Sequence, residues 1–581
     1  MTTSAITVSN PATFAEQARQ QYRLLTIGVI ALLVLACAIP FSLNLTDPDL
    51  WGHVRYGQDW LAAGEMPRTA THTFTAVDYP WVNHENAAEL LLAATYEYIG
   101  IQGMLALKCA LGLAIMATMA WFAGRHGVPA IATWALLLLV ASNLQAFFPM
   151  RPQLLSFALC TAALACLDRA FAEWDEDRSI RFAWLWPLPI VFIAWVNSHG
   201  GFVAGLCIVG AYLLGRMIEL ALRDGWASLN KQIHLAAIGI ACLAATVVNP
   251  YGLGMHAWLY HAWGGAPPEI TEWAPPRPKD PVFWPLVTLV GVAIGSLAGT
   301  RRRRDWTQIV ILALVTWQAC LHLRHIAFVA LLVGFWLPVH WHSALQRLRP
   351  DRDGRLPIML PARWMRLTLA AVILLGIVLQ STALARRLSM LPVLRSQYPV
   401  DAIQYMVDNR LNGKLVVAFN WAQYALAALA PEVTVGFDGR FDTCYPQEAI
   451  DVHFDFLLGD STGPRDRDPA AGPVNPTRVL EYHQPDMVLV ERRYKHCAAV
   501  MEAEAAKPDP QWTLLYSDAV AELWGRASRY DDPASPHYLA AEARRFDVKL
   551  LEASFQWPAM PDRSLWEESK SPLAEMQLSD L

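Results

Sequence analysis

Long apolar segments, repeated over more than half of the chain, restrict its fold more than any other feature. Of the 581 residues, 54% are hydrophobic and only 17% are charged, whereas about a quarter of the residues in a soluble protein are charged. A helix needs about 20 consecutive apolar residues to cross a bilayer. Segments of about this length cover residues 24–45, 102–123, 128–148, 153–170, 182–197, 201–219, 232–250, 281–299, 306–322, 325–341 and 366–386. The sequence therefore predicts a mainly α-helical, polytopic membrane domain of about eleven spans.

A polar tail follows the last apolar segment. Within it, β-prone runs at 414–419, 432–437 and 486–490 alternate with helical patterns, and a final strand pair is expected near 512–524. This alternation predicts an α/β soluble domain with a mainly parallel sheet. The predicted division is an N-terminal segment 1–23, a membrane domain 24–390 with a large first outer loop 46–100, an α/β domain 391–526 with a flexible insertion 460–476, and a C-terminal extension 527–581.

Basic residues predict how the chain is oriented. Arginine and lysine concentrate in alternate loops, including Arg301–Arg304 and the segment 347–366, and loops of this kind remain in the cytoplasm. We therefore expect a protein of the cytoplasmic membrane with its N-terminus inside and its C-terminal domain outside. The apolar but acidic stretch 86–100 is short for a span and is predicted as an interfacial helix broken at Gly100.

Other compositional features narrow the function only a little. A net charge of −5 gives no reason to expect a nucleic-acid partner, and the 24 tryptophans suit a protein with two membrane interfaces. The first apolar run is long enough to span and shows no cleavage site before Asp47, so we expect no cleaved signal peptide. Cys444 and Cys497 lie in the tail, where a disulfide can form outside the cytosol, but their spacing leaves the pairing open.

Polar side chains at the ends of the predicted spans converge on the outer face. Residues with a purely structural role would be distributed over both faces, and polar chemistry gathered at one membrane face indicates a functional site. The converging residues are Asp47, Asp49, His53, His84, Glu85, Arg151, Gln153, Asn197, His199, Asn249, Tyr251, Glu272, Arg324 and His325.

The two ends of the first outer loop carry acids and imidazoles. Asp47-Pro-Asp49 is equally consistent with a helix N-cap and with a carboxylate that acts as general base or holds a cation. His53 follows Asp49 by four residues, on the same helical face. His84 and Glu85 form a second cluster, which an aromatic belt and a helix cap would also explain. Together the two ends could share a Mg²⁺ or Mn²⁺ ion through Asp49 and Glu85.

Basic residues at later turns suggest a second kind of chemistry. Arg151 and Arg324-His325 lie at short turns between spans, where an arginine either snorkels to the interface or binds a phosphate in a bidentate fork. His199 lies in a two-glycine turn, and Glu272 lies in a loop that could cover a substrate groove. Asp438-Gly-Arg440 follows a predicted strand, and is either a ligand site or a turn with a local ion pair.

These motifs together resemble a known group of proteins. The segments DPDLWGHVRYGQDWL, GEMPRT, PWVNHE, RPQ, NSHGGF, NPYG, LRHIAF and GFDGR are similar to those of bacterial multi-pass proteins that are related to the GT-C superfamily of membrane glycosyltransferases. The similarity extends from about residue 24 to 526. Relatives in that superfamily include protein O-mannosyltransferases and lipid A aminoarabinose transferases, which take a sugar from a polyprenyl phosphate and use an acidic residue of the first outer loop.

The resemblance implies a glycosyltransferase that moves a hexosyl or pentosyl group from a polyprenyl-phosphate carrier to an envelope acceptor, a glycan, lipid or protein. By position, Asp47 or Asp49 would be the catalytic acid or base, with Glu85 as a helper. The implied substrate-binding residues are His53, His84, Arg151, His199, Glu272, Arg324 and His325. Two other classes are also consistent with the sequence: a lipid or glycan transporter or flippase, and a non-catalytic scaffold for envelope assembly.

Overall fold

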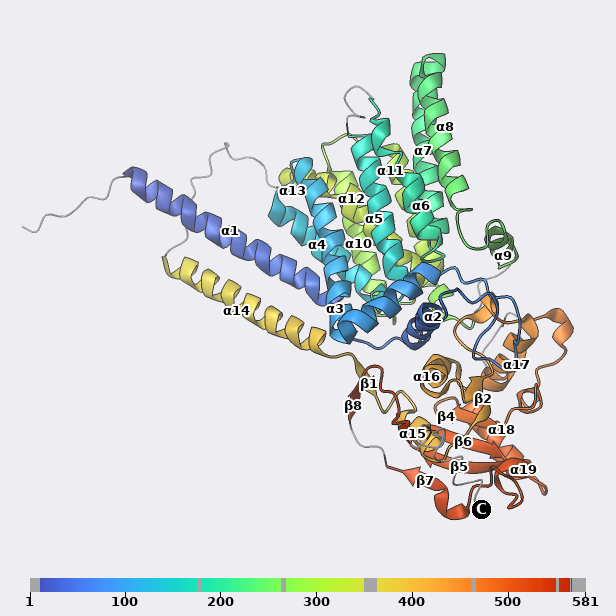
Figure 1. Ribbon diagram of the computed structural model, residues 1–581. Helices are drawn as coiled ribbons and strands as arrows, with labels where there is room; N and C mark the ends of the chain where they lie inside the picture. The colour runs from blue at the N-terminus through green and yellow to red at the C-terminus, as the bar shows by residue number, and fades with distance from the viewer. Residues whose placement is uncertain are drawn as a thin grey trace, which may run out of the picture.

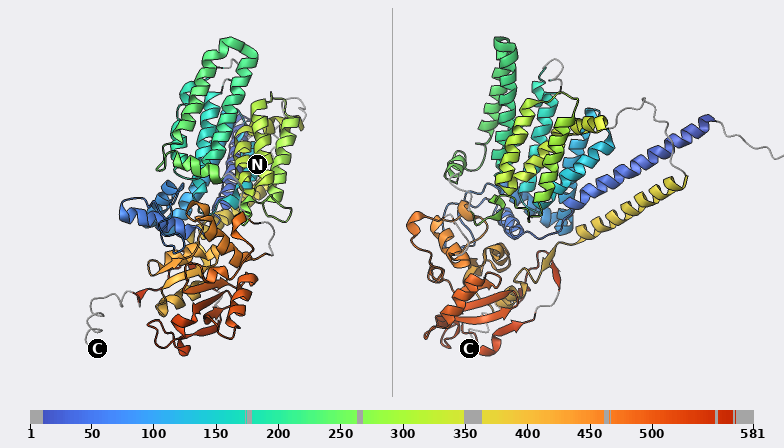
Figure 2. Two further views of the ribbon diagram at one scale, coloured as in Figure 1. Left: turned by 90° about the vertical axis from the view of Figure 1, so that its right-hand side faces the viewer. Right: turned by 180° about the vertical axis from the view of Figure 1, so that it is seen from behind.

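The structure is a computed structural model that describes residues 11–172, 174, 179–262, 268–348, 363–460, 465, 467–549, 553–564 and 566. A bundle of helices forms the membrane domain, and an α/β domain packs against one end of it (Figure 1). Both further views show the same two layers, with the described chain after residue 390 on one side only (Figure 2). The described part of the predicted insertion 460–476 includes a short 3₁₀ turn at Pro469–Ala471.

Each predicted span coincides with a helix. The helices of the membrane domain are α1 (Pro11–Phe41), α2 (Leu50–Ala63), α3 (Asn86–Arg125), α4 (Ala130–Leu144), α5 (Gln153–Ala170), α6 (Leu188–Val196), α7 (Phe202–Asp224), α8 (Leu229–Ala245), α9 (Gly254–Ala262), α10 (Phe283–Gly299), α11 (Trp306–Leu321), α12 (Ile326–Trp336), α13 (Pro338–Leu348) and α14 (Arg363–Ser389). By length and composition, six helical segments among the described residues can cross a membrane, or seven if the bent pair α12–α13 is one span. The protein is therefore a multi-pass membrane protein, and the number of eleven crossings stays a prediction.

Helix α3 bends where the sequence predicts a break. Gly100 adopts φ 64° and ψ −175° inside the helix, a conformation that is accessible to glycine at little cost. The half before the break, 86–99, leaves Leu91, Tyr98 and Ile99 exposed and packs against α2. The break therefore allows the first half of α3 to follow a different direction from the second.

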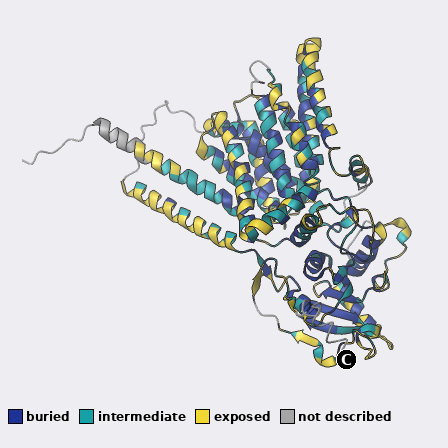
Figure 3. Cartoon of the chain, viewed as in Figure 1, coloured by how far each residue is buried: buried dark blue, intermediate teal, exposed yellow. Residues whose placement is uncertain are grey.

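Helices α1 and α14 extend to one side of the bundle as a pair (Figure 1). The surface of α14 is exposed along almost its whole length (Figure 3), and Ile373 is its single buried residue among those described. The exposed side chains are mainly leucine and valine, which suits contact with lipid.

The soluble domain is built on a six-stranded sheet. Its helices are α15 (Val400–Asp408), α16 (Phe419–Leu429), α17 (Gln447–Leu458), α18 (Lys495–Ala505) and α19 (Ala527–Tyr530), and its strands are β2 (Gly413–Val417), β3 (Val433–Val435), β4 (Met487–Glu491), β5 (Trp512–Asp518), β6 (Ala521–Arg526) and β7 (Arg545–Val548). The strand order is β3-β2-β4-β6-β5-β7. Strands β3, β2 and β4 are parallel, as predicted, but β6 is antiparallel to both β4 and β5. Cys444 and Cys497 are both buried free thiols.

The C-terminal extension folds back onto the rest of the protein. Strand β8 (Ser554–Gln556) pairs with β1 (Pro392–Leu394), which leads from the membrane domain into the soluble domain. Beyond it, the indole of Trp51 on α2 donates a 2.8 Å hydrogen bond to the carbonyl of Pro558. The extension therefore reaches α2 at the junction of the two domains.

The first outer loop extends the soluble sheet. Thr73 bridges to Val435 in parallel orientation, and the amide of Phe74 donates to the Val435 carbonyl at 3.2 Å. Strand β3 would otherwise be an open edge with unpaired backbone groups. The loop and the sheet thus share backbone hydrogen bonds, which places the edge of the sheet against the membrane domain.

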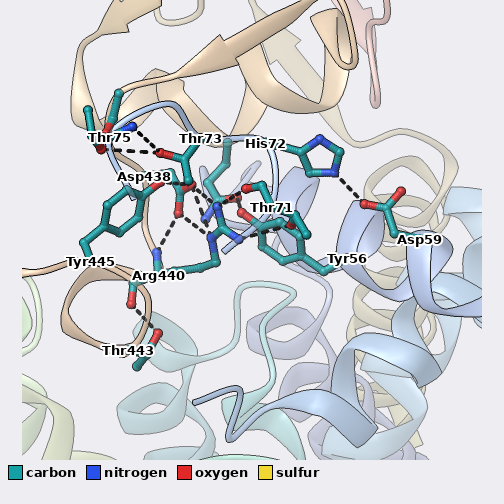
Figure 4. A network of polar contacts seen from close by, with 12 residues as sticks. Tyr56, Asp59, Thr71, His72, Thr73, Thr75, Asp438, Arg440, Thr443 and Tyr445 are labelled. Carbon is teal, nitrogen blue, oxygen red and sulfur yellow. Dashed lines mark hydrogen bonds and ion pairs between the residues drawn. The ribbon is translucent and has the colours of Figure 1, made fainter. Parts of the chain in front are cut away.

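The Asp438-Gly-Arg440 turn fastens the two domains together (Figure 4). Asp438 is fully buried and Arg440 is 7% exposed. The Arg440 guanidinium donates to Asp438 (Nη2 to Oδ2, 2.6 Å) and to the carbonyl of Thr71 in the outer loop at 2.7 Å. It also lies over the rings of Tyr56 and Trp81, 4.6 and 4.9 Å from their centroids. The hypothesis of a local ion pair is therefore the one that the structure supports.

Removing Asp438 should loosen this junction. In Asp438→Ala the Arg440 charge stays buried without its counter-charge, a change that costs about 3–5 kcal/mol. We expect a lower melting temperature in detergent and faster proteolysis near residue 440. Replacing both partners, with Arg440→Met, should recover much of the loss. If Asp438→Ala melted at the same temperature as wild type, the assignment of this ion pair as the contact that holds the two domains together would be wrong.

Candidate functional site

The candidate site lies at the end of the membrane domain that faces the soluble domain, around Arg151. This arginine precedes α5 and forms ion pairs with three carboxylates: Nε lies 2.5 Å from Asp47 Oδ2, Nη2 3.2 Å from Asp49 Oδ2, and Nη1 2.6 Å from Glu272 Oε1. The three acids raise the pKa of Arg151 well above its ordinary value against the effect of its burial. Arg151 therefore links the first outer loop to the loop that contains Glu272.

Asp47 and Asp49 differ in their surroundings. The Asp47 side chain is 5% exposed, and its Oδ1 accepts a 3.0 Å hydrogen bond from the Asp49 amide. The Asp49 side chain is 31% exposed, and it makes no side-chain cap for α2. Burial raises the pKa of Asp49 to about 6, against the charge of Arg151 and with a contribution from Asp47. Asp47 is thus enclosed, whereas Asp49 offers an accessible carboxylate.

His53 lies one turn along α2, between two glutamates. Its Nδ1 is 3.3 Å from Glu89 Oε1 and 3.8 Å from Glu85 Oε2. Glu89 Oε2 also accepts a 2.6 Å hydrogen bond from the side-chain Nδ2 of Asn83. Burial lowers the pKa of His53, but the hydrogen bond to Glu89 and the two carboxylate charges outweigh it and raise the pKa to about 9. His53 is therefore an imidazolium at neutral pH that balances the charge of its neighbours.

His199 approaches Glu85 from the turn between α6 and α7. Its Nδ1 accepts a 2.9 Å hydrogen bond from the Gly201 amide and lies 2.9 Å from Ser156 Oγ. Nε2, 3.8 Å from Glu85 Oε1, therefore carries the proton of the neutral ring. Burial lowers the pKa of His199 to about 3, so this neutral form persists over the physiological range. His199 can donate a hydrogen bond toward Glu85 or toward a ligand beside it.

The remaining predicted residues, His84, Arg324 and His325, differ in how closely they approach the carboxylates of the site. His84 lies 4.0 Å from Glu85 and stacks on Trp258 of α9 at 5.3 Å between centroids. Arg324 lies 4.3 Å above the ring of Trp273, next to Glu272. His325 contacts His322 instead, at 5.6 Å between centroids. All but His325 of the predicted site residues therefore belong to one continuous group.

Several residues of this group are absent from the sequence prediction. Glu89 is one: it lies in the stretch 86–100, which was treated as a membrane-surface helix, although its spacing of four from Glu85 signals a shared helical face. Gln423 of the soluble domain is another, and Gly439 enters the sequence prediction only as the middle residue of the Asp438-Gly-Arg440 turn. Nothing in their local sequence indicates the contact with α2, because it depends on how the domains pack.

One set of donors in this group could hold a metal ion. Atoms of His53, Glu85 and Glu89 lie within 4.8 Å of one another, and an imidazole with two carboxylates is a common donor set for zinc, manganese or iron. Among the described residues, Asp49 does not join this set, since its carboxylate faces Arg151. His53, Glu85 and Glu89 are therefore the candidate ligands in this structure, and the predicted pair of Asp49 and Glu85 stays a prediction.

Comparisons with known proteins give a likeness of fold. No family model matches the sequence, and no curated protein matches it. The crystal structure of ArnT from Cupriavidus metallidurans bound to undecaprenyl phosphate aligns with a TM-score of 0.50 and 14% identity, over 87% of this chain and 97% of that one. The apo form of the same ArnT aligns with a TM-score of 0.47 and 14% identity, over 87% of this chain and 98% of that one. The cryo-EM structure of the arabinofuranosyltransferase AftD from Mycobacteria aligns with a TM-score of 0.43 and 14% identity, over 87% of this chain and 40% of that one. The chain therefore has the fold of ArnT.

The positive charge on His53 should make the stability of the folded protein depend on pH. Because the pKa of His53 is higher in the folded state, about 9, than the usual 6.5, its stabilising effect is complete below pH 6.5 and is lost as the pH rises through 9. We expect His53→Gln to lose about 3 kcal/mol of stability near pH 6 and much less near pH 9.5. Thermal unfolding at both pH values measures this, with His234→Gln, at an exposed position on α8, as the control. An equal loss at both values would contradict an imidazolium at position 53.

Proposed function

We propose that the protein is a membrane glycosyltransferase that transfers a sugar from a polyprenyl-phosphate carrier to an envelope acceptor on the outer face of the cytoplasmic membrane. The observation that carries the proposal is the accessible Asp49 carboxylate paired with the half-buried Arg151, at one end of a bundle with the ArnT fold. That ArnT structure holds undecaprenyl phosphate, a lipid of the class we infer as the carrier here.

Each residue has a chemical task in this reaction. The carrier phosphate is already a leaving group, so the protein must remove a proton from the acceptor, balance the charge on the phosphate and align the two. Asp49 acts as the general base, because its carboxylate is accessible and its pKa lies near the working pH. Arg151 and Arg324 bind the phosphate. Asp47 is enclosed and orients Arg151.

A divalent cation at His53, Glu85 and Glu89 is part of the proposal. Such an ion would supply charge stabilisation close to the leaving phosphate. An imidazole ligand must be deprotonated to bind it. The donor set favours Mn²⁺ or Zn²⁺ over Mg²⁺, which prefers oxygen ligands.

The proton on His53 makes cation binding dependent on pH. We expect the affinity for Mn²⁺ to rise about tenfold per pH unit between pH 6 and 8, because one proton leaves for each ion bound. Isothermal titration calorimetry of the purified protein measures this, and His53→Gln and Glu89→Gln should abolish it. Binding that is independent of pH, or that survives both substitutions, would place the ion elsewhere.

The central test is turnover of a panel of polyprenyl-phosphate sugars in detergent. We expect Asp49→Asn to lower the transfer rate by about 10²–10⁴-fold with folding intact, and the wild-type rate to fall as the pH drops below about 6, where Asp49 gains its proton. Asp47→Asn should mainly raise KM for the donor. Transfer that is unaffected by Asp49→Asn would remove Asp49 as the base.

The two alternative functions differ in their expected results. A transporter or flippase would move the lipid-linked sugar across liposomes without cleaving it, and a scaffold would tolerate loss of Asp49. Among the described residues the acids and histidines of the site lie at one end of the bundle, which favours an enzyme at the membrane surface over a pathway through it.

A further inference from the structure

The soluble domain contacts the carboxylate that we propose as the general base. Gly439, in the turn that joins Asp438 to Arg440, faces Asp49 so closely that a Cβ atom at this position would lie 2.6 Å from Asp49 Oδ1. The same Cβ would lie 2.8 Å from Nε2 of Gln423. Gly439 does not have a positive φ, so its backbone conformation does not require glycine. The space next to Asp49 is what excludes a side chain here.

Gln423 of α16 fills the other side of this space. Its side chain is buried, and its Oε1 accepts a 3.0 Å hydrogen bond from the hydroxyl of Tyr56 on α2. A Cβ atom at Gly52, three residues after Asp49, would lie only 1.5 Å from the same Oε1. Two glycines, one from each domain, therefore make room for the Gln423 amide, and the space at Gly439 lies between this amide and Asp49.

The turn that carries Gly439 is held rigidly. The Arg440 amide donates a 3.0 Å hydrogen bond to Asp438 Oδ1, and the Arg440 side chain is bound to the outer loop and stacked on Tyr56 and Trp81. Since Tyr56 also binds Gln423, the fastening of the domains and the surroundings of Asp49 are one connected structure. A shift of the soluble domain would move Gln423 and Gly439 relative to the carboxylate.

We propose that Gln423 and Gly439 are positioning residues for Asp49, so that the soluble domain completes the catalytic site of the membrane domain. Asp49 lies between Arg151 on the membrane side and the surface formed by Gln423 and Gly439 on the other. Reactions of this kind are sensitive to displacement, since a catalytic group misplaced by 1 Å can lose about 10²-fold in rate. This inference rests on the proposed function for its kinetic consequence, and on the contacts alone for its structural one.

The kinetic test uses Gly439→Ala. The added methyl group must push the Asp49 carboxylate aside, so we expect kcat for sugar transfer to fall about tenfold or more while KM for the lipid-linked donor changes less than threefold. Gln423→Ala should also lower kcat, because it removes the amide that we propose as the second positioning group. Gly436→Ala is the matched control: its Cβ would meet the ring of Phe74 at 3.2 Å and no site residue. Equal kcat values for Gly439→Ala and Gly436→Ala would overturn the proposal.

A second readout does not depend on transfer. In Asp49→Cys, the rate of alkylation by a membrane-impermeant maleimide reports the surroundings of position 49, quantified on the peptide that contains it. We expect Gly439→Ala to change this rate at least threefold, and Gly436→Ala to leave it unchanged. An unchanged rate with Gly439→Ala would overturn the contact itself. If wild type transfers no sugar but the alkylation rate responds, the proposed function fails while the positioning inference stands.

Discussion

The buried charge of Arg440 is the constraint on which the arrangement of the two domains depends. A guanidinium shielded from water must be neutralised and hydrogen-bonded, and here the partners come from two domains: Asp438 from the soluble domain, and Thr71, Tyr56 and Trp81 from the membrane domain. Satisfying one charge therefore fixes the first outer loop, helix α2 and the sheet relative to one another. The backbone pairing of the loop with β3 and the contact of Pro558 with Trp51 add to the same junction.

A second group of balanced charges defines the candidate site. Arg151 is surrounded by Asp47, Asp49 and Glu272, and the imidazolium of His53 by Glu85 and Glu89. Crowded acids of this kind need cations beside them, and a group with perturbed pKa values is a candidate functional site. A phosphate entering the site would compete with Glu272 for Arg151, and a metal ion would compete with the proton on His53. The charges of the protein thus occupy the positions that we assign to the charges of the substrate and the ion.

Much of the fold could be predicted because it follows from local patterns. Apolar runs of span length predict the membrane helices other than α2 and α9, and Gly100 predicts the break in α3. Alternating strands and helices predict β2, α16, β3, α17 and β4. The C-terminal extension was not predicted to form β7 and β8, because an edge strand of three or four residues is stabilised by its partner and has little signal of its own. Most of the candidate site was recognisable as acids and histidines at span ends, but Glu89 was hidden in an apolar helix.

The amino-acid sequence was sufficient to predict a multi-pass membrane protein with a soluble α/β domain and a cluster of polar residues at the ends of its apolar segments. It also named most of the side chains that meet there, because charged residues at the ends of apolar spans are conspicuous. The packing of the chain settles which of the two aspartates is more accessible, which donors could share an ion, and that Gly439 lies against both Asp49 and Gln423. Those contacts join residues nearly 400 positions apart, and they exist because the burial of Arg440 brings two domains together, which no local pattern encodes.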